Sequence, residues 1–253
     1  MKIMLSPAKT LDMESSLPVD KFTQPLFTKD IETIRKVMKK MSAPQLGTLM
    51  HISDNLAQLN HQRFQEFETT FSEENARPAI YTFAGDVYTG LDAYTLDTKH
   101  IPYLQDNVRI LSGLYGYLRP LDLMQPYRLE MGTNIAIAKA DNLYAFWKKK
   151  ITESLNKEIQ DGELVVNLAS NEYFKAVDTK SLRGQLISPV FKDFKNDKLK
   201  VISFFAKKAR GTMTRYLVEN KASTLEDIVR FKEDGYTYSE QHTLKANEPV
   251  FIR

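Results

Sequence analysis

Residues 111–132, LSGLYGYLRPLDLMQPYRLEMG, constrain the fold more than any other stretch of this chain. Three glycines and two prolines interrupt the stretch, so neither a long helix nor a long strand can pass through it. The residues just before it, Val108, Ile110 and Leu111, are apolar and partly β-branched, as is typical of a strand. The sequence therefore predicts a strand that leads into a long, irregular, aromatic loop.

Two arginines lie in this loop, and each has a proline close by in the sequence. Because proline restricts the backbone, less entropy is lost when Arg119 or Arg128 holds a phosphate in a bidentate contact. The tyrosines of the loop can either stack on bases or fill the core. Alternatively, the loop packs on its own aromatic rings and pairs its arginines with Asp122 and Glu130.

The composition excludes several classes of site. Of the 253 residues, 42% are apolar and 26% are charged, which is ordinary for a soluble globular protein. The chain has no cysteine, so disulfides, thiolate nucleophiles and cysteine-based metal sites are excluded. Its four histidines show no metal-ligand spacing, and we expect neither a metal nor a cofactor. Pro7 and Lys9 interrupt the apolar N-terminus, so we expect a cytoplasmic protein without a membrane span.

Hydrophobic periodicity predicts a mixture of helices and strands. A single compact domain over residues 1–253 is expected, of the mixed α/β (α+β) class, with a mixed sheet and surrounding helices. Helices are predicted at 29–41, 42–50, 53–71 and 143–159, from residue 207, and from residue 223 or 224. Strands are predicted at 2–5 and 164–168, in a hairpin of 185–194 with 199–205, and near Tyr236 and Tyr238. Residues 79–91 are predicted to be a strand that runs into a Gly-Asp turn.

Residues 42–71 are predicted to form two helices joined by a tight turn. Ser42 and Gln45 fit a capping box at the start of the first helix, and Ser53 is placed to cap the second. In a helix–hairpin–helix, the turn amides and the second helix N-terminus hold a DNA phosphate, which here would involve Ser53 and Asn55. The usual turn has glycines on both sides of an apolar residue, whereas His51 and Ser53 flank Ile52 here. A plain αα-hairpin is therefore the alternative.

Basic residues are concentrated in one segment of the second half of the chain. The whole chain has a net charge of only +3, whereas residues 192–215 hold eight basic side chains and two acidic ones. A local positive excess on a nearly neutral body indicates a surface for an anionic partner. The eight basic residues are Lys192, Lys195, Lys198, Lys200, Lys207, Lys208, Arg210 and Arg215.

Within that segment, residues 207–215, KKARGTMTR, are predicted to begin a helix directly after a strand. A helix N-terminus carries a partial positive charge, so cations there are unfavourable unless an anion offsets them. The position of Lys207, Lys208 and Arg210 therefore predicts a phosphate site at a strand-to-helix junction. A solvated basic face, with the lysines turned towards water, is the alternative.

Three carboxylates stand beside glycine turns or strand ends, where catalytic acids and bases often lie. They are Asp86 in the AGDVY turn, Glu130 shortly before Gly132, and Glu172 after the 164–168 strand. These three are the candidate catalytic residues. Alternatively, Asp86 only builds its turn and Glu172 only caps a helix.

Several motifs, in order along the chain, resemble those of the bacterial YaaA family. The resemblance extends from residue 1 to near residue 253, and its one departure is the glycine-poor turn at 51–53. The motifs are SPAKTL at 6–11, FAGDVYTGL at 83–91, LSGLYGYLRPLDLMQPYRLEMG at 111–132, NLASNEYF at 167–174 and FFAKKARGTMTRY at 204–216.

This resemblance implies a role in resistance to hydrogen peroxide, in which unincorporated iron and its damage to DNA and protein are limited. It also implies DNA binding, an unusual mixed α/β fold, a positively charged cleft and a helix–hairpin–helix at 42–71. The family has no settled catalytic residues that can be transferred to this sequence.

The leading hypothesis is a largely sequence-independent DNA-binding protein, expected to be a monomer, that holds double-stranded or structured DNA through its phosphates. The alternatives are an enzyme that acts on a nucleotide or damaged nucleobase through the three carboxylates, and a protein that sequesters iron directly. Lysines 192, 195, 198 and 200 would extend the positive field at the rim of the cleft. Seven cations are predicted to line it: Lys9, Arg119, Arg128, Lys207, Lys208, Arg210 and Arg215.

Overall fold

The computed structural model describes residues 1–196 and 198–253. At its centre is a five-stranded sheet in the order β6-β5-β1-β8-β9. Strand β1 pairs in parallel with β5 and β8, β8 pairs in parallel with β9, and β6 runs antiparallel to β5. The five strands are β1 (Lys2–Leu5), β5 (Val108–Ser112), β6 (Gly116–Leu118), β8 (Leu164–Asn167) and β9 (Gln185–Ile187).

The three central strands are apolar because both faces of a parallel sheet are covered. Every residue of β1 and β5 is buried, and so are the first three residues of β8. Arg109 on β5 is only 4% exposed, and its Nε donates to Glu158 Oε2 at 2.8 Å. This charge is tolerated inside the sheet layer because it is paired and hydrogen-bonded.

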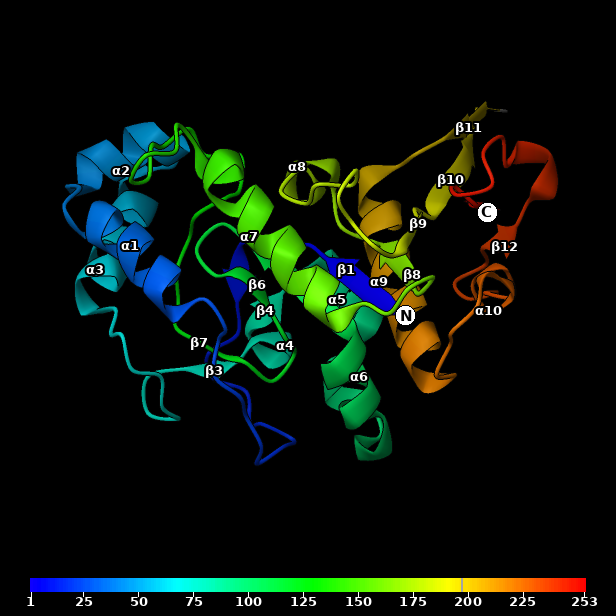
Figure 1. The fold of residues 1–253 in the computed structure, drawn as a ribbon, viewed down its shortest axis with the longest axis horizontal. Helices are drawn as coiled ribbons and strands as arrows, with labels where there is room; N and C mark the ends of the chain where they lie inside the picture. Colours follow the sequence, from blue (N-terminus) through cyan, green and yellow to red (C-terminus); the bar gives the residue numbers. More distant parts are fainter. Residues whose placement is uncertain (197) are drawn as a thin grey trace.

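Figure 1 shows a helical group at one end of the molecule and a second sheet at the other. The helical group consists of α1 (Thr28–Lys39), α2 (Ala43–Met50) and α3 (Asp54–Glu66). The second sheet has the order β11-β10-β13-β12 and lies near α9 (Ser203–Glu219) and α10 (Leu225–Val229). Its strands are β10 (Val190–Lys195), β11 (Lys198–Lys200), β12 (Thr237–Tyr238) and β13 (Val250–Ile252).

Short elements fill the space between these parts. The helical ones are α4 (Ala79–Thr82), α5 (Asp86–Leu91), α6 (Ile101–Asn107) and α8 (Asn171–Phe174), with 3₁₀ turns at Ala93–Thr95, Thr98–His100 and Glu240–His242. The strands are β2 (Thr10–Leu11), β3 (Arg77–Pro78), β4 (Phe83–Ala84) and β7 (Leu123–Met124). Within the described part of the chain, none of the helices combines the length and apolar character needed to cross a lipid bilayer.

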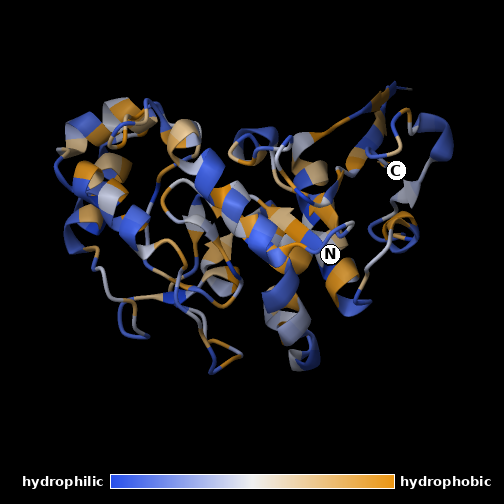
Figure 2. Ribbon diagram, viewed as in Figure 1, coloured by the Kyte–Doolittle hydropathy of each residue, from blue (hydrophilic) through white to orange (hydrophobic). Residues whose placement is uncertain are grey.

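Helix α7 (Leu143–Glu158) covers the irregular segment 111–132. Hydrophilic and hydrophobic residues alternate along it, as expected for a helix with one face on the core (Figure 2). Trp147 is fully buried, and its Nε1 donates to the Gly113 carbonyl at 2.9 Å. Gly116 has φ +72°, and a Cβ there would lie 2.8 Å from the Trp147 ring. The glycines of the segment thus let the backbone approach the indole closely.

The tyrosines of segment 111–132 are part of the core. Tyr115, Tyr117 and Tyr127 are all at most 5% exposed. The Tyr127 hydroxyl lies 2.6 Å from the Ser112 hydroxyl, and the Gln125 N–H donates to the Tyr115 hydroxyl at 2.9 Å. Because these rings are buried, they are not available to stack on bases. The mixed α/β class is confirmed.

The strand expected to run into a Gly-Asp turn within 79–91 is correct only at Phe83–Ala84, directly before Gly85. Residues 79–82 form the single turn α4, β4 has only two residues, and residues 86–91 form α5. All four residues of α4 are buried. A short run that is buried on every side has no periodicity, so the pattern cannot distinguish a strand from a helical turn.

The expected hairpin of 185–194 with 199–205 is correct only in its centre. Strands β10 and β11 pair antiparallel with Phe194 opposite Leu199, while β9 joins the central sheet instead. The expected turn includes Asp197, which lies outside the described residues. Helix α9 begins at Ser203 rather than Lys207, because the exposed Phe204 and Phe205 belong to its first turn and not to a strand. The lysines of the KKAR sequence therefore lie inside the helix and not at its N-terminus.

The helix predicted at 53–71 ends at Glu66. Phe67 and Phe71 lie beyond it and are buried, with their rings 5.9 Å apart. The shift in the phase of the apolar residues after Phe64 thus marks the end of the helix. Strand 2–5, helix 143–159, strand 164–168 and the helix after Thr224 are confirmed within one or two residues at each end.

Candidate functional site

A pocket of about 500 Å³ opens at the carboxyl ends of β1 and β8. In the sheet, β1 lies between β5 and β8, and β8 pairs in turn with β9. In open parallel sheets, ligands bind outside the carboxyl ends of two neighbouring strands whose connections leave in opposite directions. The residues just after the two strands, Ser6 to Thr10 and Leu168 to Ser170, supply part of the pocket lining.

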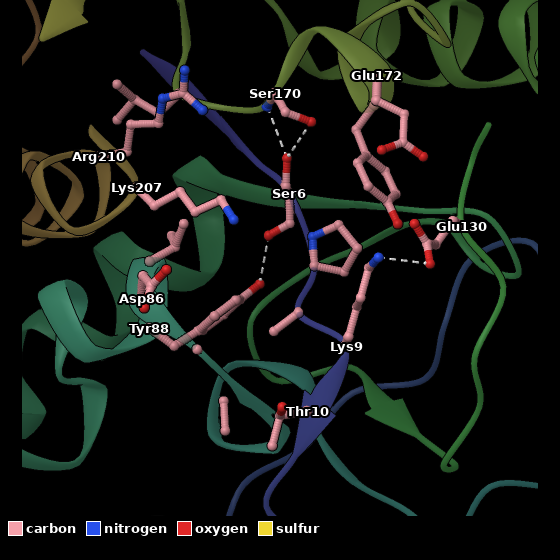
Figure 3. Close-up of a pocket in the computed structure, with 17 residues that line it drawn as sticks. Ser6, Lys9, Thr10, Asp86, Tyr88, Glu130, Ser170, Glu172, Lys207 and Arg210 are labelled. Carbon is pink, nitrogen blue, oxygen red and sulfur yellow. Dashed lines mark hydrogen bonds and ion pairs between the residues drawn. The ribbon is translucent and has the colours of Figure 1, made fainter. Parts of the chain in front are cut away.

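Hydrogen bonds hold the floor of the pocket together. The Ser170 N–H donates to Ser6 Oγ at 2.8 Å, which ties the loop after β1 to the loop after β8. The Tyr88 hydroxyl donates to the Ser6 carbonyl at 2.9 Å, which ties α5 to the same point (Figure 3). Burial raises the pKa of Tyr88 well above its ordinary value, so this hydroxyl stays protonated as a donor. Ser6 is therefore the common anchor of the floor.

Helices α5 and α9 cross with their backbones in contact, and two glycines allow it. A Cβ on Gly211 would overlap the Val87 carbonyl and lie 2.7 Å from the Leu91 nitrogen. A Cβ on Gly90 would overlap the Lys208 carbonyl in the same way. This close crossing brings one face of α9 over the start of α5, which carries Asp86.

Lys207 and Arg210 line the pocket from α9. They are three residues apart, so they project from one face of the helix. Burial lowers the pKa of the Arg210 guanidinium, and neither side chain makes an ion pair or hydrogen bond to a described residue. A partly desolvated cation without a partner is unfavourable unless a ligand supplies the anion. These two cations are therefore the strongest indication of a binding site.

The opposite side of the pocket is acidic. Figure 3 shows Lys207 and Arg210 on one side of Ser6, and Glu130 and Glu172 on the other. Lys9 Nζ lies 2.9 Å from Glu130 Oε1, and the Gly132 N–H donates to Glu172 Oε1 at 3.0 Å.

All three candidate carboxylates, from motifs far apart in the sequence, line this pocket. Asp86 lies in the first turn of α5, and its side chain makes no hydrogen bond or ion pair to a described residue. The structure thus brings together Lys9, Lys207 and Arg210 with Asp86, Glu130 and Glu172.

The prediction that seven cations line one cleft is wrong for Arg119. It lies in a different hollow, of about 510 Å³, beside Arg109 and Glu158. Its Nη2 is 2.8 Å from Asp122 Oδ1 and 2.9 Å from the Gln24 carbonyl, to which it donates. Asp122 is fully buried, so the pair forms a structural link inside the loop. The alternative in which the loop pairs its own arginines is thus correct here.

Arg128 and Arg215 are also engaged by the protein. Arg128 Nη2 lies 3.3 Å from Glu130 Oε1, behind the acidic side of the pocket. Arg215 donates to the Asp92 carbonyl at 2.8 Å and lies 2.9 Å from Glu219 Oε1, so it fastens the C-terminal end of α5. Both arginines hold the frame of the site and have little charge left for a ligand.

The remaining basic residues of the segment lie outside the pocket lining. Lys208 Nζ lies 3.5 Å from Asp234 Oδ1, on another face of α9. Lys192 and Lys195 are on β10, where Lys195 is exposed, and Lys198 and Lys200 are exposed on β11. These four lysines have no ion pair with a described residue. They remain candidates for a positive rim.

Helices α2 and α3 form the expected helical hairpin, and its role in DNA binding stays a prediction. His51 has φ 52° and ψ 51°, which is the left-handed conformation that glycine usually adopts at this position. The turn therefore lacks the usual glycine, but its first residue has the backbone conformation of one. Ser53 is the N-cap of α3, and Asn55 is exposed. In Figure 1 the hairpin lies at the end of the molecule away from α9.

Sequence reasoning missed several residues of the pocket. Ser6, Tyr88 and Ser170 build its floor, and Tyr173 lines it. All four belong to motifs that also hold charged candidates, so attention to charge alone left them out. Arg63 on α3 was also missed; burial lowers its pKa, and no described residue is its hydrogen-bond or ion-pair partner. The signal for Arg210 is that residues 206–214 contain no acid, whereas Arg63 has Glu66 three residues along and the sequence does not single it out.

Metal ligation finds no support in the described residues. Over residues 1–196 and 198–253, no group of three or more histidine, cysteine, aspartate or glutamate side chains is arranged to hold a metal ion.

Comparison with known proteins identifies the family. A family model described as peroxide stress protein YaaA matches residues 1–242. The chain belongs to this YaaA family. Among curated relatives, a UPF0246 protein of Flavobacterium psychrophilum is 54% identical over 253 residues, and one of Flavobacterium johnsoniae is 53% identical, each over the full length of both chains. A UPF0246 protein of Alteromonas mediterranea is 54% identical and covers all of this chain and 98% of its own. YaaA family membership supports a role in the response to peroxide.

Proposed function

We propose that this YaaA family member is a cytoplasmic DNA-binding protein of the peroxide response. It holds DNA by its phosphates, largely without regard to sequence, and thereby limits iron-dependent oxidative damage. The observation that carries the proposal is the pair Lys207 and Arg210, which have no partner among residues 1–196 and 198–253 although Arg210 is partly buried. A guanidinium and an ammonium that face the same space can together bind a phosphate group.

The positive rim extends this site into a surface large enough for a duplex. The half-buried Lys192, the exposed Lys195, Lys198 and Lys200, and the two pocket cations together make six positive charges for phosphate contacts. Contacts to about six phosphates would lower the affinity about 10³-fold between 50 and 200 mM salt. The αα-hairpin offers a second phosphate contact at the other end of the molecule, through Ser53, Asn55 and Arg63, for which no described residue is a partner.

Fluorescence anisotropy with a labelled duplex tests the proposal. Arg210→Gln should weaken DNA binding about tenfold, because one charge-assisted contact is lost. Lys208→Gln is the matched control: it removes the same charge two residues away, from a lysine that Asp234 already pairs. An affinity that does not change with salt, or equal loss in both variants, would contradict phosphate binding by the pocket.

A second candidate function is an enzyme that acts on a nucleotide or damaged nucleobase. It is favoured by one observation, that Asp86, Glu130 and Glu172 all line the pocket that holds the free cations. General acid–base catalysis needs carboxylates within reach of a bound substrate. Replacing each carboxylate by alanine should abolish turnover of damaged-base DNA or nucleotides and leave duplex affinity intact. If duplex affinity or the melting transition is lost instead, these carboxylates are structural.

A further inference from the structure

Lys207 and Arg210 lie on one side of the pocket with Asp86, whereas Glu130 and Glu172 lie on the other with Lys9. Cations outnumber carboxylates on the first side and carboxylates outnumber cations on the second, and this limits what the pocket can bind. A small inorganic anion would be attracted by Lys207 and Arg210 but repelled by Glu130 and Glu172 across the pocket. A simple cation would meet the opposite difficulty. The pocket therefore fits a ligand that is anionic at one end and presents hydrogen-bond donors at the other.

The acidic side has free acceptors for such donors. The contacts to Glu130 and Glu172 from Lys9, Arg128 and Gly132 all go to Oε1. Neither Oε2 has a hydrogen-bond partner among residues 1–196 and 198–253. Carboxylate oxygens accept from the amino groups of nucleobases and from sugar hydroxyls.

Apolar side chains also line the pocket. Pro7, Ala8 and Leu168 line the pocket together with the rings of Tyr88 and Tyr173, and both rings are less than 10% exposed. A volume of about 500 Å³ falls within the range of pockets that enclose small organic ligands. These side chains suit a flat, uncharged body between the anionic end and the donor end.

We propose that this pocket binds a single nucleotide, with its phosphate against Lys207 and Arg210 and its base or sugar against Glu130 and Glu172. The inference rests on the proposed nucleic-acid function and names the unit that the site takes. A free mononucleotide and a nucleotide left unpaired in a DNA strand present the same chemistry, and the experiment distinguishes them.

The experiment uses 2-aminopurine, a fluorescent base whose emission changes when it leaves a base stack. Three probes are titrated with the full-length protein: a short duplex with one unpaired 2-aminopurine, the same duplex with that base paired, and the free 2-aminopurine nucleoside monophosphate. The variants are Glu172→Gln and Arg210→Gln, with Lys208→Gln as control. Glutamine at 172 can still accept from the Gly132 N–H, so the loop is preserved while the charge is removed.

The expected result is a change in emission for the unpaired base that Glu172→Gln weakens about tenfold, with affinity for the paired duplex unchanged. Arg210→Gln should weaken binding of both duplexes, and Lys208→Gln should change neither. If the free monophosphate displaces the unpaired-base duplex from the pocket, the ligand is a free mononucleotide. If it does not, the ligand is an unpaired nucleotide within a DNA strand. Should Arg210→Gln lose its melting transition, Lys207→Gln replaces it, because Lys207 is exposed.

Equal emission from the two duplex complexes, together with wild-type behaviour of Glu172→Gln, would overturn the nucleotide pocket. Salt-dependent binding of the paired duplex would then still support the proposed function. Conversely, binding of the monophosphate without binding of either duplex would retain the pocket and reject DNA binding.

Discussion

Segments 111–132 and 207–215 both place arginines near glycines, yet the fold uses those arginines in opposite ways. Arg119 is bound by the fully buried Asp122, three residues away, and fastens a loop. Arg210 is partly buried, and no described residue is its partner. The difference follows the acids: Arg215 has Glu219 four residues away and pairs with it, whereas residues 206–214 contain no acid. A basic motif thus indicates a binding site only where no nearby carboxylate neutralises it.

The largest effect should come from alkaline pH, which acts on the first segment. Burial raises the pKa of Tyr115, Tyr117 and Tyr127. The unfolded chain releases these protons near pH 10, while the folded chain retains them, so stability is lost as pH rises above about 10. Three such groups would cost about 4 kcal/mol at about pH 11. Urea unfolding at several pH values measures this loss.

Tyr127→Phe provides the control for the pH experiment. It removes one titrating group, so its stability should fall less steeply with pH than that of the wild type. A stability that stays constant from about pH 9 to about pH 11 would mean that these hydroxyls are not shielded from water.

Gly211→Ala should have the next largest effect, on the second segment. The added methyl group would overlap the Val87 carbonyl, so α5 and α9 must separate. We expect a loss of about 3 kcal/mol in unfolding free energy and a loss of DNA affinity, since Lys207 and Arg210 move with α9. Gly47→Ala is the control, because the nearest atom to the added Cβ would be Ala57 Cβ, at an ordinary contact distance of 3.4 Å. Equal melting temperatures for the two variants would disprove the close crossing.

Asp122→Asn should lower stability by about 2 kcal/mol, because it leaves Arg119 without its counter-ion. Thr23 also donates to this carboxylate, at 2.6 Å, so a buried network is disturbed. Duplex affinity should remain within about twofold of the wild type, since Arg119 lies away from the pocket. If affinity fell as far as in Arg210→Gln, the contrast between the two segments would be wrong.

The smallest effect is expected for Lys9→Gln. Lys9 pairs with Glu130, but its side chain is 60% exposed, and surface ion pairs contribute less than about 1 kcal/mol. Thermal denaturation should show almost no change in melting temperature. A large drop would show that Lys9 holds the acidic side of the pocket in place.

Much of the framework could be predicted from the sequence, because its signals are local. The apolar run 2–5 and the four-residue repeat of 143–159 report burial directly, and the confirmed strand and helix follow from them. The start of α9 could not be predicted, since exposed Phe204 and Phe205 resemble a strand. The strand prediction assumed that these two rings are buried, and the sequence alone does not show whether a ring is buried or exposed.

The candidate site was predictable in its members but not in its grouping. Asp86, Glu130, Glu172, Lys207 and Arg210 were each selected from local patterns, and they share one pocket. Arg119 was grouped with them wrongly, because nothing in the sequence says on which side of the sheet a loop returns. The distances between segments depend on the crossing of α5 and α9, which is a property of packing.

The meeting of Gly90 with Gly211 also sets when the site can form during synthesis. Ser6 leaves the ribosome long before α9, which begins only at Ser203, so the cationic side of the pocket comes last. A nascent chain that ends before α9 contains every strand of the central sheet but not Lys207 or Arg210. Contacts so distant in sequence form late and slowly. The proposed binding is thus withheld until α9 has been made.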